Sequence, residues 1–456
     1  MPSNATIAAI RFGCGLSPLA PAPADAAAIL AGLAAPDQAL ADFPGPDPQQ
    51  VWALGHQVTE HNRDARANVP GAAEALKETR RQINVMNDAA LLNFVQRGVY
   101  GASGFRERLQ DFWTNHFTVV GKLARVKAIP SVFADEAVRP HMTGRFTDLL
   151  TAVVTHPAML IYLDQITSSG PQSRAGERQK RGLNENLARE VLELHTLGVG
   201  AGYSQTDVRQ FAYLLTGLTL DNKDGQFRFN PNMVEPAAET LLGKTYGGPP
   251  KDKLAQIHRA LDDIALRPET AQHIATKIAV HFVADTPDPG LVQAMTAAYR
   301  RSGGDLTAVY SAMLDHPAAW APPGAKVRMP FDYIVAALRA LAPPRETLAG
   351  LRPQQIQRFV QTPLIGMGQP FQQAPGPNGW HEDSAGWVTP PLLAARIQWA
   401  MAVPQQLLPD LPDPRDFVQV ALADAASQTV IDAARQAENR REGVGLVLAS
   451  NDFNRR

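Results

Sequence analysis

The chain has 456 residues, of which 45% are hydrophobic and 19% are charged, and its formal net charge is −1. This is the composition of a globular protein, and the balanced charge argues against nucleic acid as a partner. Its single cysteine, Cys14, cannot form an intrachain disulfide or a thiolate metal cluster.

Residues 1–48 are the first predicted part of the chain, with short helices and a Pro-rich linker. The residues up to Arg11 show no basic region followed by an apolar run. We therefore expect no signal peptide and a cytoplasmic location, with export as the alternative. The longest apolar run, 149–163, is interrupted by His156-Pro157 and is too short to span a membrane.

Helical periodicity dominates the remaining sequence, so we predict a mainly α protein with a large, bundle-like body of many helices. One small β-hairpin is predicted near 218–229, where two apolar segments flank Asp-Asn-Lys-Asp-Gly. The second part, 49–245, is predicted as a helical core that contains this hairpin. The third, 246–456, is a C-terminal helical half, and one continuous domain is the alternative.

Residues 105–116 carry an aromatic stripe at helical spacing, which is typical of a core helix. His116 lies on the stripe, so a hydrogen-bonded core histidine is one interpretation. Asn115 and His116 at the helix end could instead both point into a pocket.

The helix predicted at 185–197 is the most chemically rich stretch of the chain. Asn184 can cap its start, and Gly198 can end it in the left-handed conformation. One arc of under half the circumference is polar, whereas His195 falls on the apolar side. That arc contains Glu185, Asn186, Arg189, Glu190, Glu193 and Thr196.

Three interpretations of this polar face compete. The first is a solvated ladder of Glu185, Arg189 and Glu193, with each i, i+4 pair stabilising the helix by roughly 0.2–0.5 kcal/mol. The second is a buried pair of Glu190 and Glu193, whose like charges raise one pKa and equip them for acid–base work. The third is a metal site that adds His116 to this pair.

The segment 366–390 is a long irregular loop that contains Phe371, Trp380 and Trp387. A loop of this length is usually functional or disordered, and the aromatic residues indicate that it is ordered. We expect it to pack on the helical body as a lid over the polar face of helix 185–197.

Several stretches together resemble one bacterial family of unknown function, DUF1800, over essentially the whole chain. They are Phe112-Trp-Thr-Asn-His-Phe117, His156-Pro-Ala-Met-Leu-Ile-Tyr-Leu-Asp164, helix 183–198, Gly202-Tyr-Ser-Gln-Thr-Asp-Val, Gly379-Trp380 with Trp387, and the final Asn-Asp-Phe-Asn-Arg-Arg456.

The resemblance implies a predominantly helical protein, many of whose relatives are exported and occur alongside a sulfatase-like family. This chain departs from the family pattern at Leu218, where a tryptophan is typical, and at Val234-Glu235, where a His-Asp pair is typical.

We therefore predict an enzyme with a polar pocket that acts on a small or carbohydrate-like substrate by acid–base or metal-assisted chemistry. The alternative is a non-catalytic binding or assembly protein whose charged helix is a structural network. The cofactor is left open, with a divalent metal as one option, and so are a protein partner and the oligomeric state. The catalytic candidates are Glu190, Glu193, Arg189 and His116, and the substrate-binding candidates are Asn115, Asn184, Glu185, Asn186, His195, Trp380 and Trp387.

Overall fold

The computed structural model describes residues 2–121, 127–179, 182–221, 223–322, 324 and 326–456. It is mainly α-helical, as predicted, with two small two-stranded sheets among these residues. Within this part of the chain, none of the helices is both long and apolar enough to cross a membrane.

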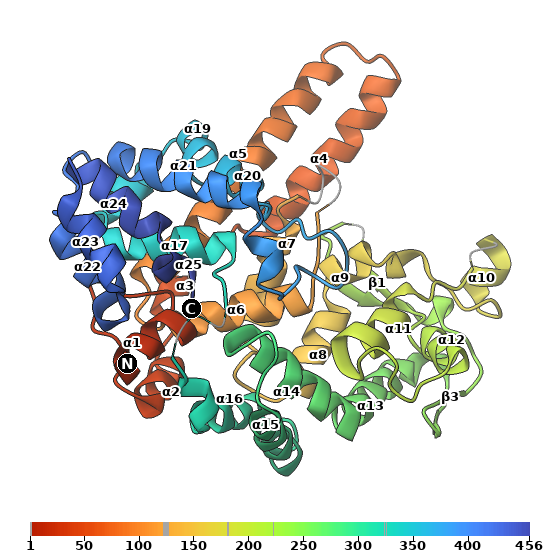
Figure 1. The fold of residues 1–456 in the computed structure, drawn as a ribbon. Helices are drawn as coiled ribbons and strands as arrows, with labels where there is room; N and C mark the ends of the chain where they lie inside the picture. Colours follow the sequence, from red (N-terminus) through yellow and green to blue (C-terminus); the bar gives the residue numbers. More distant parts are fainter. Residues whose placement is uncertain (1, 122–126, 180–181, 222, 323, 325) are drawn as a thin grey trace.

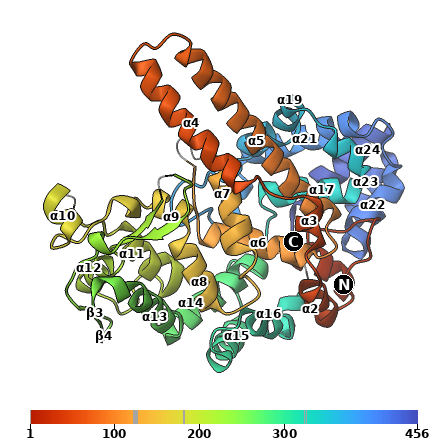
Figure 2. The ribbon, with the colours of Figure 1, turned by 180° about the vertical axis from the view of Figure 1, so that it is seen from behind.

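The first hundred residues form an N-terminal group of short helices and then a long helical hairpin. The short elements are α1 (Asn4–Ile7), the π-helix η1 (Ala8–Phe12), α2 (Ala26–Ala34) and α3 (Gln38–Asp42), and the hairpin consists of α4 (Pro48–Arg66) and α5 (Ala72–Tyr100). Figures 1 and 2 show α4 and α5 projecting from the body as an arm. A small apolar cluster of Leu54, Val58 and Ile83 joins the two helices of this arm.

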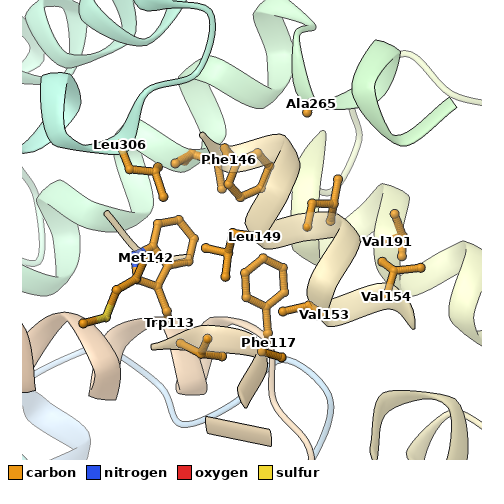
Figure 3. Close-up of a cluster of buried hydrophobic side chains, with 14 of the residues drawn as sticks. Trp113, Phe117, Met142, Phe146, Leu149, Val153, Val154, Val191, Ala265 and Leu306 are labelled. Carbon is orange, nitrogen blue, oxygen red and sulfur yellow. The ribbon is translucent and has the colours of Figure 1, made fainter. Parts of the chain in front are cut away.

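The middle of the chain is built from a large group of short and medium-length helices. These elements are α6 (Gly104–His116), α7 (Ile129–Phe133), η3 (Ala134–Val138), α8 (Phe146–Thr155), α9 (Pro157–Tyr162), α10 (Arg174–Gln179), α11 (Asn186–Glu190), η5 (Val191–Thr196), α12 (Gln205–Leu214), α13 (Lys253–Ala265), α14 (Pro268–Phe282), α15 (Pro289–Ser302) and α16 (Leu306–Leu314). Figure 3 shows Phe146, Leu149 and Val153 of α8 gathered with Trp113 and Phe117. The aromatic stripe of α6 is therefore core, as its spacing predicts.

The C-terminal helices form a second hydrophobic cluster, which also takes in the last part of α5. They are α17 (Pro330–Leu341), α18 (Arg345–Ala349), α19 (Pro353–Ile356), η9 (Gln357–Gln361), α20 (Thr362–Gly366), α21 (Pro390–Leu407), α22 (Pro414–Leu422), α23 (Gln428–Gln436), α24 (Arg440–Ala449) and α25 (Asn451–Asn454). Both views place the end of the chain beside α6 (Figures 1 and 2).

The predicted hairpin is present as β1 (Leu218–Leu220) paired with β2 (Phe227–Phe229), and residue 222 between them lies outside the described residues. The structure corrects the prediction of a single hairpin, because β3 (Glu239–Leu241) pairs with β4 (Lys244–Tyr246) in a second one. Its two-residue turn places Leu242 at φ +50° and Gly243 at φ +81°. Two positive φ angles are typical of a tight hairpin turn, which usually has Asn or Asp where this chain has Leu242.

Candidate functional site

The central helix of the sequence is present as α11 followed by the π-helical turn η5. Asn184 Oδ1 accepts a hydrogen bond from the backbone N–H of Asn186 at 2.8 Å, and Gly198 follows the helix at φ +94°. The N–H of Leu197 donates to the carbonyl of Leu192, five residues earlier, at 3.0 Å. This π-turn changes the carbonyl pairing of the last helical turn.

Two histidines from other helices bind carbonyl groups of this last turn. His116 Nε2 donates to the carbonyl of His195 at 3.1 Å, and His273 Nε2 donates to that of Leu194 at 3.1 Å. Burial lowers the pKa of His116 well below its ordinary value and that of His195 to about 3. His116 is thus a neutral, hydrogen-bonded core histidine.

Glu185 is the centre of a polar network at the surface. It accepts hydrogen bonds from Arg189 at 3.2 Å, Arg209 at 3.2 Å and Gln205 at 2.8 Å. Asn186 is exposed next to it. These contacts connect α11 to α12 and fit the ladder interpretation for the start of the motif helix.

Glu190 and Glu193 are half-buried on the next turn. Burial and then the charge of Glu193 raise the pKa of Glu190 above its ordinary value. The hydroxyl of Tyr203 is hydrogen-bonded to Glu193 and has a raised pKa, caused by burial and then by this carboxylate. Glu190 and Glu193 thus lie in one half-buried environment, in which their like charges repel each other.

The described residues contain no group of three or more His, Cys, Asp or Glu side chains arranged to hold a metal ion. His116 therefore does not complete a ligand set with Glu190 and Glu193. The donor geometry of this part of the chain gives the metal interpretation no support.

A cavity of about 100 Å³ lies elsewhere, between α6, α14, the start of α17 and the loop 366–390. Aromatic rings of Phe331, Phe371 and Trp380 line it together with polar groups from α6. Those polar residues are Asp111, Thr114 and Asn115. Glu185, Arg189, Glu190 and Glu193 are not part of its lining, so the structure separates the motif helix from this cavity.

The loop 366–390 is held over the cavity by Asn115. Asn115 Nδ2 donates to the carbonyl of Trp380 at 3.1 Å, and its Oδ1 accepts from the backbone N–H of Trp380 at 2.7 Å. Gly379 has φ +75°, and a Cβ there would lie 2.5 Å from the carbonyl oxygen of Asn115. Only glycine suits this close approach.

Trp387 anchors the same loop from below. It is buried, stacks on His381 with ring centroids 4.5 Å apart, and donates from Nε1 to the carbonyl of His381 at 3.1 Å. Among the described residues, no hydrogen bond or ion pair links the loop to the polar face of α11 and η5. The loop covers the cavity of α6 and α14 rather than the polar face on which we expected it.

A buried ionic network forms the floor of the cavity. Asp332 accepts hydrogen bonds from Arg108 Nη1 and, at 3.0 Å, from Arg456 Nη1. Arg108 Nη2 lies 2.8 Å from His281 Nε2, and His281 Nδ1 lies 2.8 Å from Glu382 of the loop. Because a guanidinium can only donate, Nε2 of His281 is the acceptor and its Nδ1 carries the proton.

Two carboxyl groups at the cavity, those of Glu382 and Asp111, have opposite electrostatic environments. Burial alone would raise the pKa of Glu382, but His281 and Lys326 hold it at about 2. Asp111 forms no ion pair or side-chain hydrogen bond with the described residues. Burial, and then the neighbouring charge of Asp332, raise the pKa of Asp111 well above its ordinary value.

Asn115 and Trp380, which the sequence predicts as binding residues, both line this cavity. The predicted residues do not include Asp111, His281, Asp332 and Glu382. One signal was available, because Arg108, Asp111 and Asn115 follow the spacing i, i+3, i+7 and so share one face of α6. The other members come from positions far along the chain and have no local pattern in common.

The positions that depart from the family pattern lie in the interior. Leu218 is fully buried in the main hydrophobic cluster. Glu235 is buried too, and its carboxylate accepts a hydrogen bond from the backbone N–H of Gln172 at 3.1 Å. Neither residue lines the cavity.

The fold and the site define a mainly helical protein with a buried ionic network beneath a loop-covered cavity. The family model described as "Protein of unknown function (DUF1800)" matches residues 7–455, and the chain belongs to this family. Comparisons with curated proteins and with solved structures give no match.

Proposed function

We propose that this protein is an enzyme that performs acid–base chemistry on a small molecule bound in the cavity between α6, α14 and the loop 366–390. The supporting observation is that two carboxyl groups, Asp111 and Asp332, line the cavity in opposite electrostatic environments. Two arginines bind Asp332, whereas Asp111 has no ion pair among the described residues. A carboxyl group with a raised pKa beside an ion-paired carboxylate can supply one acid and one anion.

In this proposal, protonated Asp111 donates its proton to an oxygen of the substrate. Asp111 is later protonated again by the product or by water. The aromatic rings of Phe331, Phe371 and Trp380 provide apolar contact area. The hydroxyl of Thr114 and the amide nitrogen of Gln372 are buried and have no hydrogen-bond partner among the described residues. Both residues line the cavity and can orient a polar ligand.

The predicted roles of Asn115 and Trp380 change within this proposal. Asn115 uses both ends of its side-chain amide on the backbone of Trp380, so it holds the loop in place. Trp380 contributes its ring to the wall.

The second candidate function, binding or assembly without turnover, is favoured by the motif helix. The hydrogen bonds of Glu185 to Arg189, Gln205 and Arg209 are those of a structural network. In this alternative, Glu190 and Glu193 do not act on a substrate.

The two functions are separated by turnover measurements on Asp111→Asn. Pools of small molecules are incubated with the full chain, and conversion is followed by mass spectrometry. We expect conversion by the wild type and a loss of roughly 10²–10⁴-fold in Asp111→Asn.

The matched control is Asp88→Asn, because Asp88 is also a buried aspartate with a raised pKa but lies outside the cavity. This control should retain conversion. Undiminished conversion by Asp111→Asn contradicts the proposed role of Asp111. A compound that raises the melting temperature without being converted favours the binding alternative.

A further inference from the structure

A second, smaller cavity of about 10 Å³ lies beneath the first and shares four wall residues with it, Phe94, Asp111, Phe331 and Asp332. Three arginines line this inner cavity, Arg108, Arg328 and Arg456. They are 2%, 2% and 1% exposed. Three guanidinium groups so deeply buried at one point are costly unless negative charge compensates them.

Each of the three arginines has a nitrogen without a partner among the described residues. These atoms are Arg108 Nε, Arg328 Nη2 and Arg456 Nε. Arg328 is the least satisfied by charge, because its Nη1 donates to the carbonyl of Phe453 and its guanidinium lies 4.8 Å from the centre of the Phe453 ring. Buried donors of this kind usually have a partner, either in the protein or in a bound molecule.

The carboxylates of the wall do not balance these charges. Glu107 accepts hydrogen bonds from Arg139 Nη1 and Nη2, at 2.8 Å and 2.7 Å, and not from any of the three arginines. Arg139 also binds Asp37. Asp332 accepts from both Arg108 and Arg456. Among the described residues, Asp332 is the only carboxylate of the wall that forms an ion pair with any of the three guanidinium groups.

We propose that the inner cavity is an anion site in which Arg108, Arg328 and Arg456 bind the carboxylate of a small organic acid, the rest of which lies in the outer cavity beside Asp111. The inference rests on the proposed function and names its substrate class. The inner space is about that of one water molecule, which suits the end of a carboxylate or a chloride ion and excludes the four oxygens of phosphate or sulfate. Guanidinium groups match carboxylates in shape and charge.

The proposal is tested by the melting temperature of the full chain in titrations with sodium acetate and sodium propionate. Acetamide and propionamide are the uncharged probes of the same shape, and sodium chloride provides the same ionic strength. We expect a saturable rise with the two carboxylates and none with the amides, because a ligand that binds only the folded state stabilises it.

The variants are Arg328→Met, Arg328→Lys and the control Arg11→Met. Arg11 is an equally buried arginine that donates to the carbonyls of Ala319 and Pro322 and lies outside the inner cavity. Each variant is compared with its own ligand-free melting temperature, so a general loss of stability does not obscure the result. Arg328→Met should bind carboxylates at least about tenfold more weakly, Arg328→Lys should lose less, and Arg11→Met should match the wild type.

Three results of the melting experiments would overturn the proposal. They are equal shifts with the amides, an unchanged response of Arg328→Met, and saturation by chloride alone with no further effect of the carboxylates. Asp111→Asn should keep carboxylate binding, which separates this site from the proposed catalysis. Carboxylate binding without any Asp111-dependent turnover would support the anion site and contradict the proposed function. Asp111-dependent turnover restricted to uncharged compounds would support the proposed function and contradict the anion site.

Discussion

Asp111 differs from Asp332 and Glu382 of the buried network, because it forms no ion pair with the described residues. It lies one helical turn before Asn115 on α6, so the helix that holds the loop also presents the acid. Its neighbour Asp332 is oriented by Arg108 and Arg456. The same residue type therefore has two different electrostatic roles in one cavity.

The two aspartates should respond differently to substitution by asparagine. Asp111→Asn should not lower the free energy of unfolding at neutral pH. The raised pKa of Asp111 means that ionisation of this carboxyl group does not stabilise the folded state. Asp332→Asn should lower it by roughly 3–5 kcal/mol, because Arg108 and Arg456 lose their buried counter-charge. Urea unfolding of both variants checks this, and equal losses would contradict the assignment.

Glu190 makes a prediction about pH. Its pKa is raised above the ordinary 4.5, so the folded state holds this proton more tightly than the unfolded chain does. Its contribution to stability is therefore greatest at acidic pH and is lost as the pH rises through the raised pKa. Glu190→Gln should remove this loss, so the stability of the variant relative to wild type should increase from about pH 4.5 upward.

The measurement is the urea midpoint of wild type and Glu190→Gln as a function of pH. Glu185→Gln is the informative comparison, because the pKa of Glu185 is lowered by its hydrogen-bonding partners against the effect of burial. That variant should lose stability at neutral pH. A constant difference between Glu190→Gln and wild type across the pH range would contradict the raised pKa of Glu190.

The candidate site could be predicted from the sequence only where its residues lie on one element. The spacing of α6 places Arg108, Asp111 and Asn115 on one face, and the aromatic residues of 366–390 indicate an ordered loop. The partners Asp332 and Arg456 lie more than two hundred residues further along. Their approach to Arg108 depends on tertiary packing, which no local pattern encodes.

Among the elements, the motif helix shows which features of a helix can be predicted from sequence periodicity and which cannot. Its existence and its end at Gly198 were predicted, whereas the π-turn η5 was not. The last carbonyl groups of this turn are bound by His116 of α6 and His273 of α14, which lie far from it in the sequence. The second hairpin is not predicted from the sequence, because Leu242 occupies a turn position at which Asn or Asp is usual.

The arm of α4 and α5 should open independently of the body. Its distal part is held together by the small cluster of Leu54, Val58 and Ile83, which is separate from the two large clusters. Val58→Ala removes two buried methyl groups and should cost about 1–2 kcal/mol in local stability. Hydrogen exchange should accelerate in α4 and the first half of α5 and stay unchanged in α8.

The matched control for the arm is Val153→Ala in α8, a fully buried valine of the main cluster. This variant should lower the melting temperature of the whole chain. If Val58→Ala lowers it equally and accelerates exchange in α8, then the arm and the body unfold as one unit.

At the scale of the whole molecule, the two large hydrophobic clusters are joined by ion pairs through the cavity. Arg108 belongs to α6 of the first cluster, Asp332 to α17 of the second, and Arg456 to the end of the chain. The three sequence parts predicted at 1–48, 49–245 and 246–456 stay a prediction. The residues of the first cluster extend from Ala8 to Ala319 and so cross those boundaries.

The whole chain should lose stability in mildly acidic solution because several histidines are buried in the neutral form. Burial lowers the pKa values of His116, His195, His273 and His281 below the ordinary 6.5. The unfolded chain takes up these protons below pH 6.5 and the folded state does not, so their contribution is complete above 6.5 and is lost as the pH falls. His195, with a pKa of about 3, should contribute across this whole window.

The test compares His195→Gln with wild type between pH 6.5 and pH 4.5, above the range in which most carboxylates titrate. The raised carboxyls Asp111 and Glu190 act in the opposite sense there, so the difference between the two proteins is measured rather than either slope. That difference should change by about 1.4 kcal/mol per pH unit in favour of the variant as the pH falls. The exposed His56→Gln is the control for the substitution of histidine by glutamine. Parallel curves for His195→Gln would mean that His195 is protonated in the folded state, beside the imidazole groups of His116 and His273.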